Sequence, residues 1–170
     1  KQRALGFLFA QIKEDTVVYS APREGYAPYA VLKTAQRFGK KVRMYFPASK
    51  RMSETQALLF ENGLTEEDAV FRRIAAMPNL NREAKQWADD NGAFFVPLGA
   101  RHEAVTAALI RTAYAMSYRP KSVAVATSTG VLIRSLQIAW PETIFHSVVV
   151  ARNLQEGEKG PAKFWPSPLP

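Results

Sequence analysis

Short apolar runs alternate along the chain with segments whose apolar residues recur every three or four positions. Some runs are rich in Val, Ile, Phe and Tyr and are apolar at both odd and even positions. Such runs are typical of strands buried on both faces. We predict six strands: Thr16–Ser20, Lys41–Phe46, Ala69–Ile74, Ala93–Pro97, Ser122–Thr127 and Ile144–Ala151. The segments between them have helical spacing and helix-ending signals, such as Gly39 after Phe38. We predict helices over Arg3–Lys13, Tyr29–Phe38, Ser53–Glu61, Asn81–Asp90, Glu103–Met116 and Gly130–Trp140.

The regular alternation of strands and helices predicts the fold class. Parallel strands need helical crossovers, so the order indicates an α/β fold, a three-layer open, mostly parallel sheet with helices on both faces. We expect the six strands in one sheet, with Val123–Ala126 central and Thr16–Ser20 in the same sheet. We also expect a single α/β domain over residues 1–153, followed over residues 154–170 by a Pro-rich tail or the start of a further region.

Composition restricts the function classes. The net charge of +8 on 170 residues favours an anionic partner such as nucleic acid, a nucleotide or a phosphorylated cofactor. The alternative is that the excess charge only favours solubility, since the basic residues are scattered. The chain has no cysteine and only two histidines, so we expect no disulfide and no metal site.

No apolar run approaches the roughly 20 residues of a membrane helix, and we expect a cytoplasmic protein without membrane contact. Serine hydrolases and P-loop NTPases are disfavoured because their glycine motifs are absent. The first residue is Lys rather than Met and no element closes the C-terminal end, so we expect a fragment.

A turn in the second half of the chain is the strongest local signal. The run Val123–Ala126 leads through Thr127, Ser128, Thr129 and Gly130 directly into the helical pattern that begins at Val131. The N–H groups at such a helix start, with the helix dipole behind them, favour a bound anion, usually phosphate. The alternative is an ordinary helix cap at Ser128 or Thr129, with Gly130 relieving a tight turn.

The loop after Thr16–Ser20 is a second candidate, because ligands bind beyond the carboxyl ends of parallel strands. Arg23 in this loop could bind a carboxylate or phosphate, or it could form a surface ion pair with Glu24. For His102, at a helix start, we weigh a ligand contact against a helix cap. For His146, inside a strand, we expect a packed core position rather than a catalytic one.

Four segments then occur in a recognisable order: Lys1-Gln2-Arg3 at the start of a helix, a strand and Gly-containing loop over Val17–Ala27, the loop Phe95–Ala100, and the turn Ala126–Leu132. Over about residues 1–152, this order and spacing resemble the central part of the fold-type-II pyridoxal-phosphate (PLP) enzymes. That group includes the tryptophan synthase β-subunit, cysteine synthase, threonine synthase and aminocyclopropane-carboxylate deaminase.

The resemblance implies a PLP-dependent lyase or transferase that acts on a small amino acid by elimination, replacement or deamination. It implies that Lys1 carries the cofactor as a Schiff base and acts as the proton shuttle. The residues that would hold the cofactor are Thr127, Ser128, Thr129, Gly130 and Val131. Those that would hold the substrate are Ser20, Arg23, Glu24, Gly25 and Tyr26.

Two other function classes stay open beside the enzyme. One is a non-catalytic, nucleic-acid- or nucleotide-associated protein that reuses the fold and binds phosphate through its basic surface. The other, a nucleotide or sugar-phosphate transferase, needs an acidic pair at a strand end, and the chain offers only Asp89-Asp90 before a loop. A homodimer is also left open.

Overall fold

The computed structural model describes residues 2–73, 76–150 and 160–166, and Lys1 therefore lies outside the described residues. Its contacts divide the chain into two compact units, residues 1–100 and 101–170, and each is described by itself. Both units are α/β, with parallel strands flanked by helices, which confirms the predicted class. The single-domain boundary at residue 153 stays a prediction.

The first unit is built around a four-stranded parallel sheet in the order β3-β2-β1-β4. Its strands are β1 (Thr16–Ser20), β2 (Lys41–Pro47), β3 (Ala69–Arg72) and β4 (Phe94–Val96). Its helices are α1 (Gln2–Phe9), α2 (Ala27–Arg37), α3 (Glu54–Glu61) and α4 (Met77–Asp90), with a short 3₁₀ turn η1 (Leu98–Ala100) after β4. The predicted strand over residues 16–20 has these bounds in the structure, and the other predicted elements of this unit occur with shifted ends.

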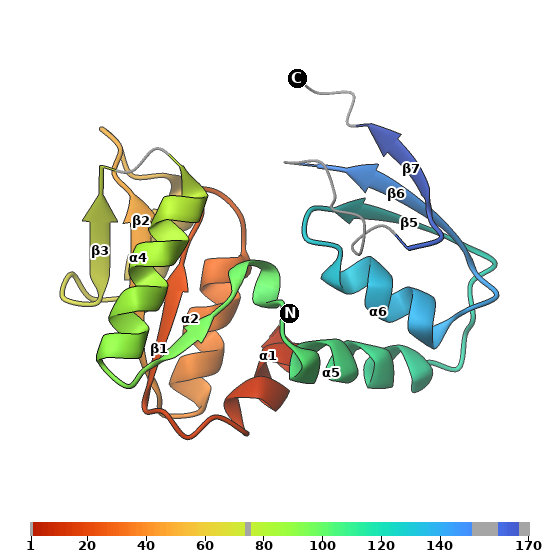
Figure 1. The fold of residues 1–170 in the computed structure, drawn as a ribbon, viewed down its shortest axis with the longest axis horizontal. Helices are drawn as coiled ribbons and strands as arrows, with labels where there is room; N and C mark the ends of the chain where they lie inside the picture. The colour runs from red at the N-terminus through yellow and green to blue at the C-terminus, as the bar shows by residue number, and fades with distance from the viewer. Residues whose placement is uncertain (1, 74–75, 151–159, 167–170) are drawn as a thin grey trace. The chain divides into compact units, whose positions relative to one another are not determined.

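Helices cover both faces of this sheet, as the apolar pattern of its strands predicts. Figure 1 shows α4 over one face and α2 on the other, and α1 packs against α2. The core beneath α4 consists of Val18, Tyr45, Val70, Leu80, Ala84 and Ala88. Val17, Val18 and Tyr19 are almost completely buried, because β1 lies between two strands and between two layers of helices.

The strand order changes direction at β1. The chain adds β2 and then β3 on one side of β1, and it crosses through α4 to place β4 on the other side, where Tyr19 pairs with Val96. In open parallel sheets, ligands bind outside the carboxyl ends of the strands at such a switch point. The segments that follow β1 and β4 at this point are residues 21–26 and η1.

The second unit holds a three-stranded parallel sheet in the order β5-β6-β7 (Figure 1). Its elements are α5 (Glu103–Tyr114), β5 (Ser122–Thr127), α6 (Val131–Ala139), β6 (Ile144–Val149) and β7 (Lys163–Pro166). The predicted strand over residues 122–127 has these bounds, and β7 adds a strand inside the segment expected to be a tail.

The expectation of one sheet centred on Val123–Ala126 is wrong. β5 pairs with β6 alone among the described residues, and β1 belongs to the other sheet. The physical reason lies in the alternate positions of β5, where Ala124 and Ala126 are exposed while Val125 and Thr127 are buried. Alanine is apolar but small, so an exposed strand face made of alanine has the same apolar pattern as a buried one.

The second unit has its own core between α5, α6 and the sheet. It contains Ala113, Val125, Ile133, Ala139, Trp140, Phe145 and Ala162, with partly buried Ile110, Val123 and Leu136 against it. The Trp140 indole Nε1–H donates a hydrogen bond of 3.2 Å to the Ala113 carbonyl, which joins the end of α6 to α5. Because Ala162 belongs to this core, the chain entering β7 is anchored by apolar contact as well as by strand pairing.

We expect Ile133→Ala to lower the free energy of unfolding by about 2–5 kcal/mol, since it removes a fully buried side chain and leaves a cavity in this core. Ile138→Ala on the same helix is the matched control, because Ile138 is 48 % exposed. Denaturant unfolding of both variants measures the difference. Equal losses of stability in the two variants would contradict the core assignment.

Candidate functional site

The loop after β1 leads into a helix whose start is open to an anion. Tyr26 occupies the N-cap position of α2 without a side-chain cap, and Pro28 stands in the first turn. Gly25, with φ of 109°, adopts a backbone conformation that favours glycine, and nothing lies within 4 Å of where a Cβ would project. The first-turn N–H groups of α2 are therefore not satisfied by a cap, and the positive end of the helix dipole faces the loop.

Ser20 is held in place at the end of β1 rather than left free. It is completely buried, and its hydroxyl donates a short hydrogen bond to Oδ1 of Asn81 in the first half of α4. Sequence reasoning treated Asn81 only as a helix start and missed this contact. The bond ties the strand that precedes the loop to the helix that covers the sheet.

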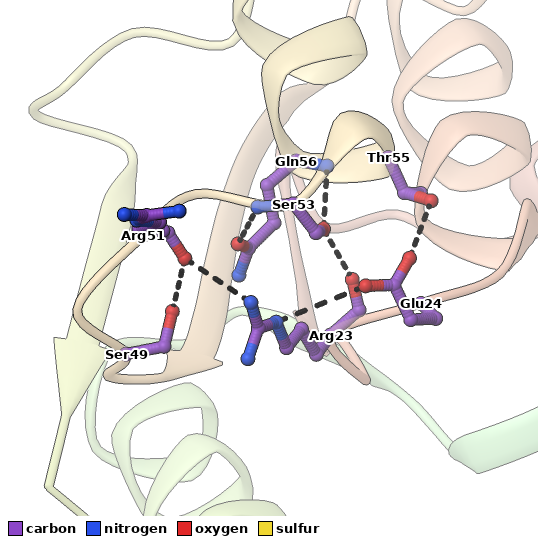
Figure 2. A network of polar contacts seen from close by, with 7 residues as sticks. All are labelled: Arg23, Glu24, Ser49, Arg51, Ser53, Thr55 and Gln56. Carbon is purple, nitrogen blue, oxygen red and sulfur yellow. Dashed lines mark hydrogen bonds and ion pairs between the residues drawn. The ribbon is translucent and has the colours of Figure 1, made fainter.

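Arg23 and Glu24 form a polar network with the segment that enters α3 (Figure 2). Arg23 Nε lies 3.7 Å from Glu24 Oε1, and Arg23 Nη2 donates to the Arg51 carbonyl at 3.4 Å. Ser53 Oγ donates to the Arg23 carbonyl at 2.7 Å, and Thr55 Oγ1 donates to Glu24 Oε2 at 3.3 Å. The ion pair weighed from the sequence is thus present, and the side chains remain 49 % and 67 % exposed.

The start of α3 makes this tether rigid. Ser53 and Gln56 form a reciprocal capping box, in which the Ser53 hydroxyl accepts from the Gln56 N–H and the Gln56 side chain accepts from the Ser53 N–H. Because Ser53 also donates to the Arg23 carbonyl, the same hydroxyl fixes the helix end and the loop. The main chain of the loop is therefore hydrogen-bonded to the start of α3.

Tyr19 connects the end of β1 to η1, the turn that follows β4. Its side chain is buried in the first unit, and the N–H of Gly99 in η1 hydrogen bonds to the phenol oxygen. Burial raises the pKa of Tyr19 to about 12, and the Gly99 N–H opposes the rise. The phenol stays protonated at neutral pH, so its contribution here is to position η1 beside the end of β1.

In the second unit, Thr127 does not direct its hydroxyl to a ligand. Its side chain is buried beside Ser147, whose hydroxyl donates to Thr127 Oγ1 at 2.6 Å, and Thr127 in turn donates to the Val125 carbonyl at 3.2 Å. The hydroxyl is therefore used within the sheet. Any contact of Thr127 with a phosphate would have to come from its main chain.

The turn after Thr127 has the chemistry of an anion cradle. Gly130 is the N-cap of α6 with φ of 76°, and no side chain caps the helix. Ser128 and Thr129, both partly exposed, add hydroxyl donors at the same turn. The uncapped first turn, which begins at Val131, and these two hydroxyls fit a phosphate group. The loop after β1 and this turn belong to different units.

The remaining candidates have mainly structural roles. His102 caps α5, because its Nδ1 accepts from the Ala104 N–H at 3.1 Å. His146 is partly exposed, because it alternates along β6 with the buried Phe145 and Ser147, so the expectation of a packed core histidine is wrong.

Within the described residues there is no cluster of His, Cys, Asp and Glu suited to a metal ion, and no helix is long and apolar enough to cross a membrane.

Several solved enzymes share this fold. An ACC deaminase homologue superposes with a TM-score of 0.79 at 12 % identity, over 96 % of this chain and 58 % of that chain. The processed form of threonine deaminase isoform 2 from Solanum lycopersicum gives 0.67 at 14 % identity, over 87 % and 42 %. Escherichia coli diaminopropionate ammonia lyase gives 0.61 at 13 % identity, over 87 % and 48 %.

These neighbours are fold-type-II PLP enzymes, so the resemblance expected from the order of the elements is confirmed at the level of the fold. The chain spans about half the length of these solved structures. The sequence matches no family model and no curated protein.

We expect stability to fall at alkaline pH through Tyr19. Its pKa is raised from 10.0 to about 12 in the folded state, so the stabilisation is complete below pH 10 and is lost between pH 10 and pH 12. The loss amounts to about 3 kcal/mol. Denaturant unfolding as a function of pH measures it.

Tyr19→Phe should remove this part of the pH dependence. Tyr26→Phe is the control and should retain it, because Tyr26 is 75 % exposed. The same alkaline slope in Tyr19→Phe as in the unmodified protein would show that another group is responsible.

Proposed function

We propose that this chain is part of a cytoplasmic PLP-dependent enzyme that acts on a small amino acid by elimination, replacement or deamination. The observation that carries the proposal is the uncapped start of α6 behind Gly130, at a strand–turn–helix junction. Its donors suit a phosphate, and the fold is that of deaminases and an ammonia lyase. PLP, when bound, supplies an electron sink for bonds at the substrate α-carbon.

The turn before α6 would hold the phosphate of the cofactor. The N–H groups from Ser128 to Val131, with the hydroxyls of Ser128 and Thr129, would bind the phosphate. Thr127 would act through its main chain, since its hydroxyl is bonded within the sheet. Lys1 would hold the cofactor covalently and move a proton at the substrate α-carbon. This assignment of Lys1 rests on its place in the order of the elements and on its chemistry as an amine nucleophile.

The loop from Ser20 to Tyr26 would bind the substrate carboxylate. Pro28 has no N–H, so the uncapped first turn of α2 offers the N–H groups of Ala27 and Tyr29, and nothing lies within 4 Å of the position of a Cβ at Gly25. Arg23 would add positive charge, moderated by Glu24, with which it is paired. Ser20, bonded to Asn81, would fix the direction in which the loop leaves β1.

The first test concerns Lys1. Purified protein mixed with PLP should develop a visible absorbance band, and borohydride reduction should leave the cofactor on a peptide containing Lys1. Lys1→Ala should lose the band and the turnover of amino-acid substrates, whereas Lys41→Ala on β2 should keep both. If the protein gains no band and instead binds DNA or RNA with an affinity that falls steeply with salt, the nucleic-acid alternative replaces the enzyme.

The second test concerns the turn at Gly130. Gly130→Val should abolish binding of PLP while the protein stays folded, because a side chain there disturbs a left-handed residue at the helix start and crowds the phosphate. The control is Gly92→Val, at a turn with φ of 59° and nothing within 4 Å of its Cβ position. Circular dichroism checks the fold of both variants. Unchanged affinity for PLP in Gly130→Val would mean that the turn connects β5 to α6 without binding the cofactor phosphate.

A further inference from the structure

A second concave site lies on the first unit, between the edge strand β3 and α4. It is a groove of about 860 Å³, and the loops discussed above do not line it. Its lining residues are Tyr45, Arg72, Arg73, Ala76, Asn79, Arg82, Glu83, Gln86, Trp87 and Asp90. We call it the arginine groove.

The charges in the arginine groove leave an excess of positive charge. Glu83 forms a salt bridge with Arg72, and Asp90 accepts a hydrogen bond of 2.9 Å from Gln86. Gln86 is neutral, so Asp90 keeps its negative charge, and three arginines against two carboxylates leave the lining with a net charge of +1. Arg73 and Arg82 form no ion pair with any residue that the structure describes.

A further arginine stands behind the wall of the groove. Arg43 on β2 lies with its guanidinium 4.4 Å from the centre of the Trp87 ring and 5.8 Å from that of Tyr45. Its Nε is buried without a hydrogen-bond partner among the described residues. Arg43 itself is partly exposed, so an anion in the groove would interact favourably with its charge through the electrostatic field.

The N-terminal end of α4 adds to the positive electrostatic potential of the groove. Ala76 is the N-cap of this 14-residue helix and has no side-chain cap, and both Ala76 and Asn79 line the groove. The positive end of the helix dipole therefore lies at the end of the groove that Ala76 and Asn79 line.

We propose that the arginine groove binds a multivalent phosphate anion, either a polyphosphate or the phosphate groups of a small metabolite. Arg72 lies at the end of β3, Arg73 directly follows it, and Arg82 lies on α4. A tetrahedral phosphate accepts hydrogen bonds from several directions, whereas one planar carboxylate is matched by a single arginine fork. This site is separate from the proposed cofactor site and does not depend on it.

Pyrophosphate is the probe, titrated into the purified protein at low ionic strength and followed by calorimetry and by tryptophan fluorescence, since Trp87 lines the groove. We expect saturable binding that weakens as salt is added. Arg73→Gln combined with Arg82→Gln should weaken it by about tenfold or more for each arginine. Arg37→Gln, which removes an equal charge at the end of α2, should leave the affinity unchanged.

Glu83→Gln gives the opposite sign and separates binding from folding. It frees Arg72 from its salt bridge, so pyrophosphate should bind several-fold more tightly, although the folded protein loses an ion pair. A variant that only damaged the structure would bind more weakly. Because the turn at Gly130 could also hold a phosphate, the titrations are repeated in Gly130→Val, where the dependence of pyrophosphate binding on Arg73, Arg82 and Glu83 should persist.

Three results would overturn the proposal. The first is no saturable binding of pyrophosphate, or equal affinity in the double arginine variant. The second is citrate binding as tightly as pyrophosphate through the same arginines, which would assign the groove to carboxylates. The third is single-stranded DNA binding that depends on Arg73 and Arg82 while pyrophosphate does not bind.

Discussion

The parallel pairing of β1 with both β2 and β4 is the constraint on which the first unit depends. Two parallel strands cannot be joined by a tight turn, so each pairing requires the chain to cross back along a face of the sheet. The crossing to β4 lays α4 over β1 and buries Val18 beneath it. The same crossing brings Asn81 to Ser20 and Gly99 to Tyr19, so the polar contacts at the end of β1 follow from the strand order.

The positions of helices and strands could be predicted because a buried element has a local pattern of apolar residues. The pairing partners of the strands could not be predicted in this way. The apolar run at 16–20 and the helical period after it indicate elements whatever their partners are. Pairing depends on contacts between distant residues, which a single sequence does not encode locally. Ala124 and Ala126 made β5 resemble a central strand, and the structure has them exposed on an edge strand.

The candidate sites were predictable to the same degree. The loop after β1 and the turn at Gly130 follow strand ends, and that position alone marks them. The inward direction of Thr127 could have been found, because it shares the parity of Val125, and both are buried. The Ser20–Asn81 contact joins residues far apart in the chain, so no local motif indicated it. The arginine groove is lined, apart from Tyr45, by residues between 72 and 90, but it forms only where α4 packs beside β3, and the sequence does not show that packing.

The chain offers two physically different ways to bind an anion. The turn before α6 would use main-chain N–H groups, which no side chain caps in the structure. The arginine groove uses mobile side chains, and Glu83 already neutralises part of its charge by pairing with Arg72. The first arrangement depends on the geometry of the helix start, because its donors are fixed to the backbone. The second depends on net charge and weakens as ions screen it. The charge of +8 is therefore a poor guide to ligand chemistry, because a few placed groups, rather than the total, decide which anion is held and where.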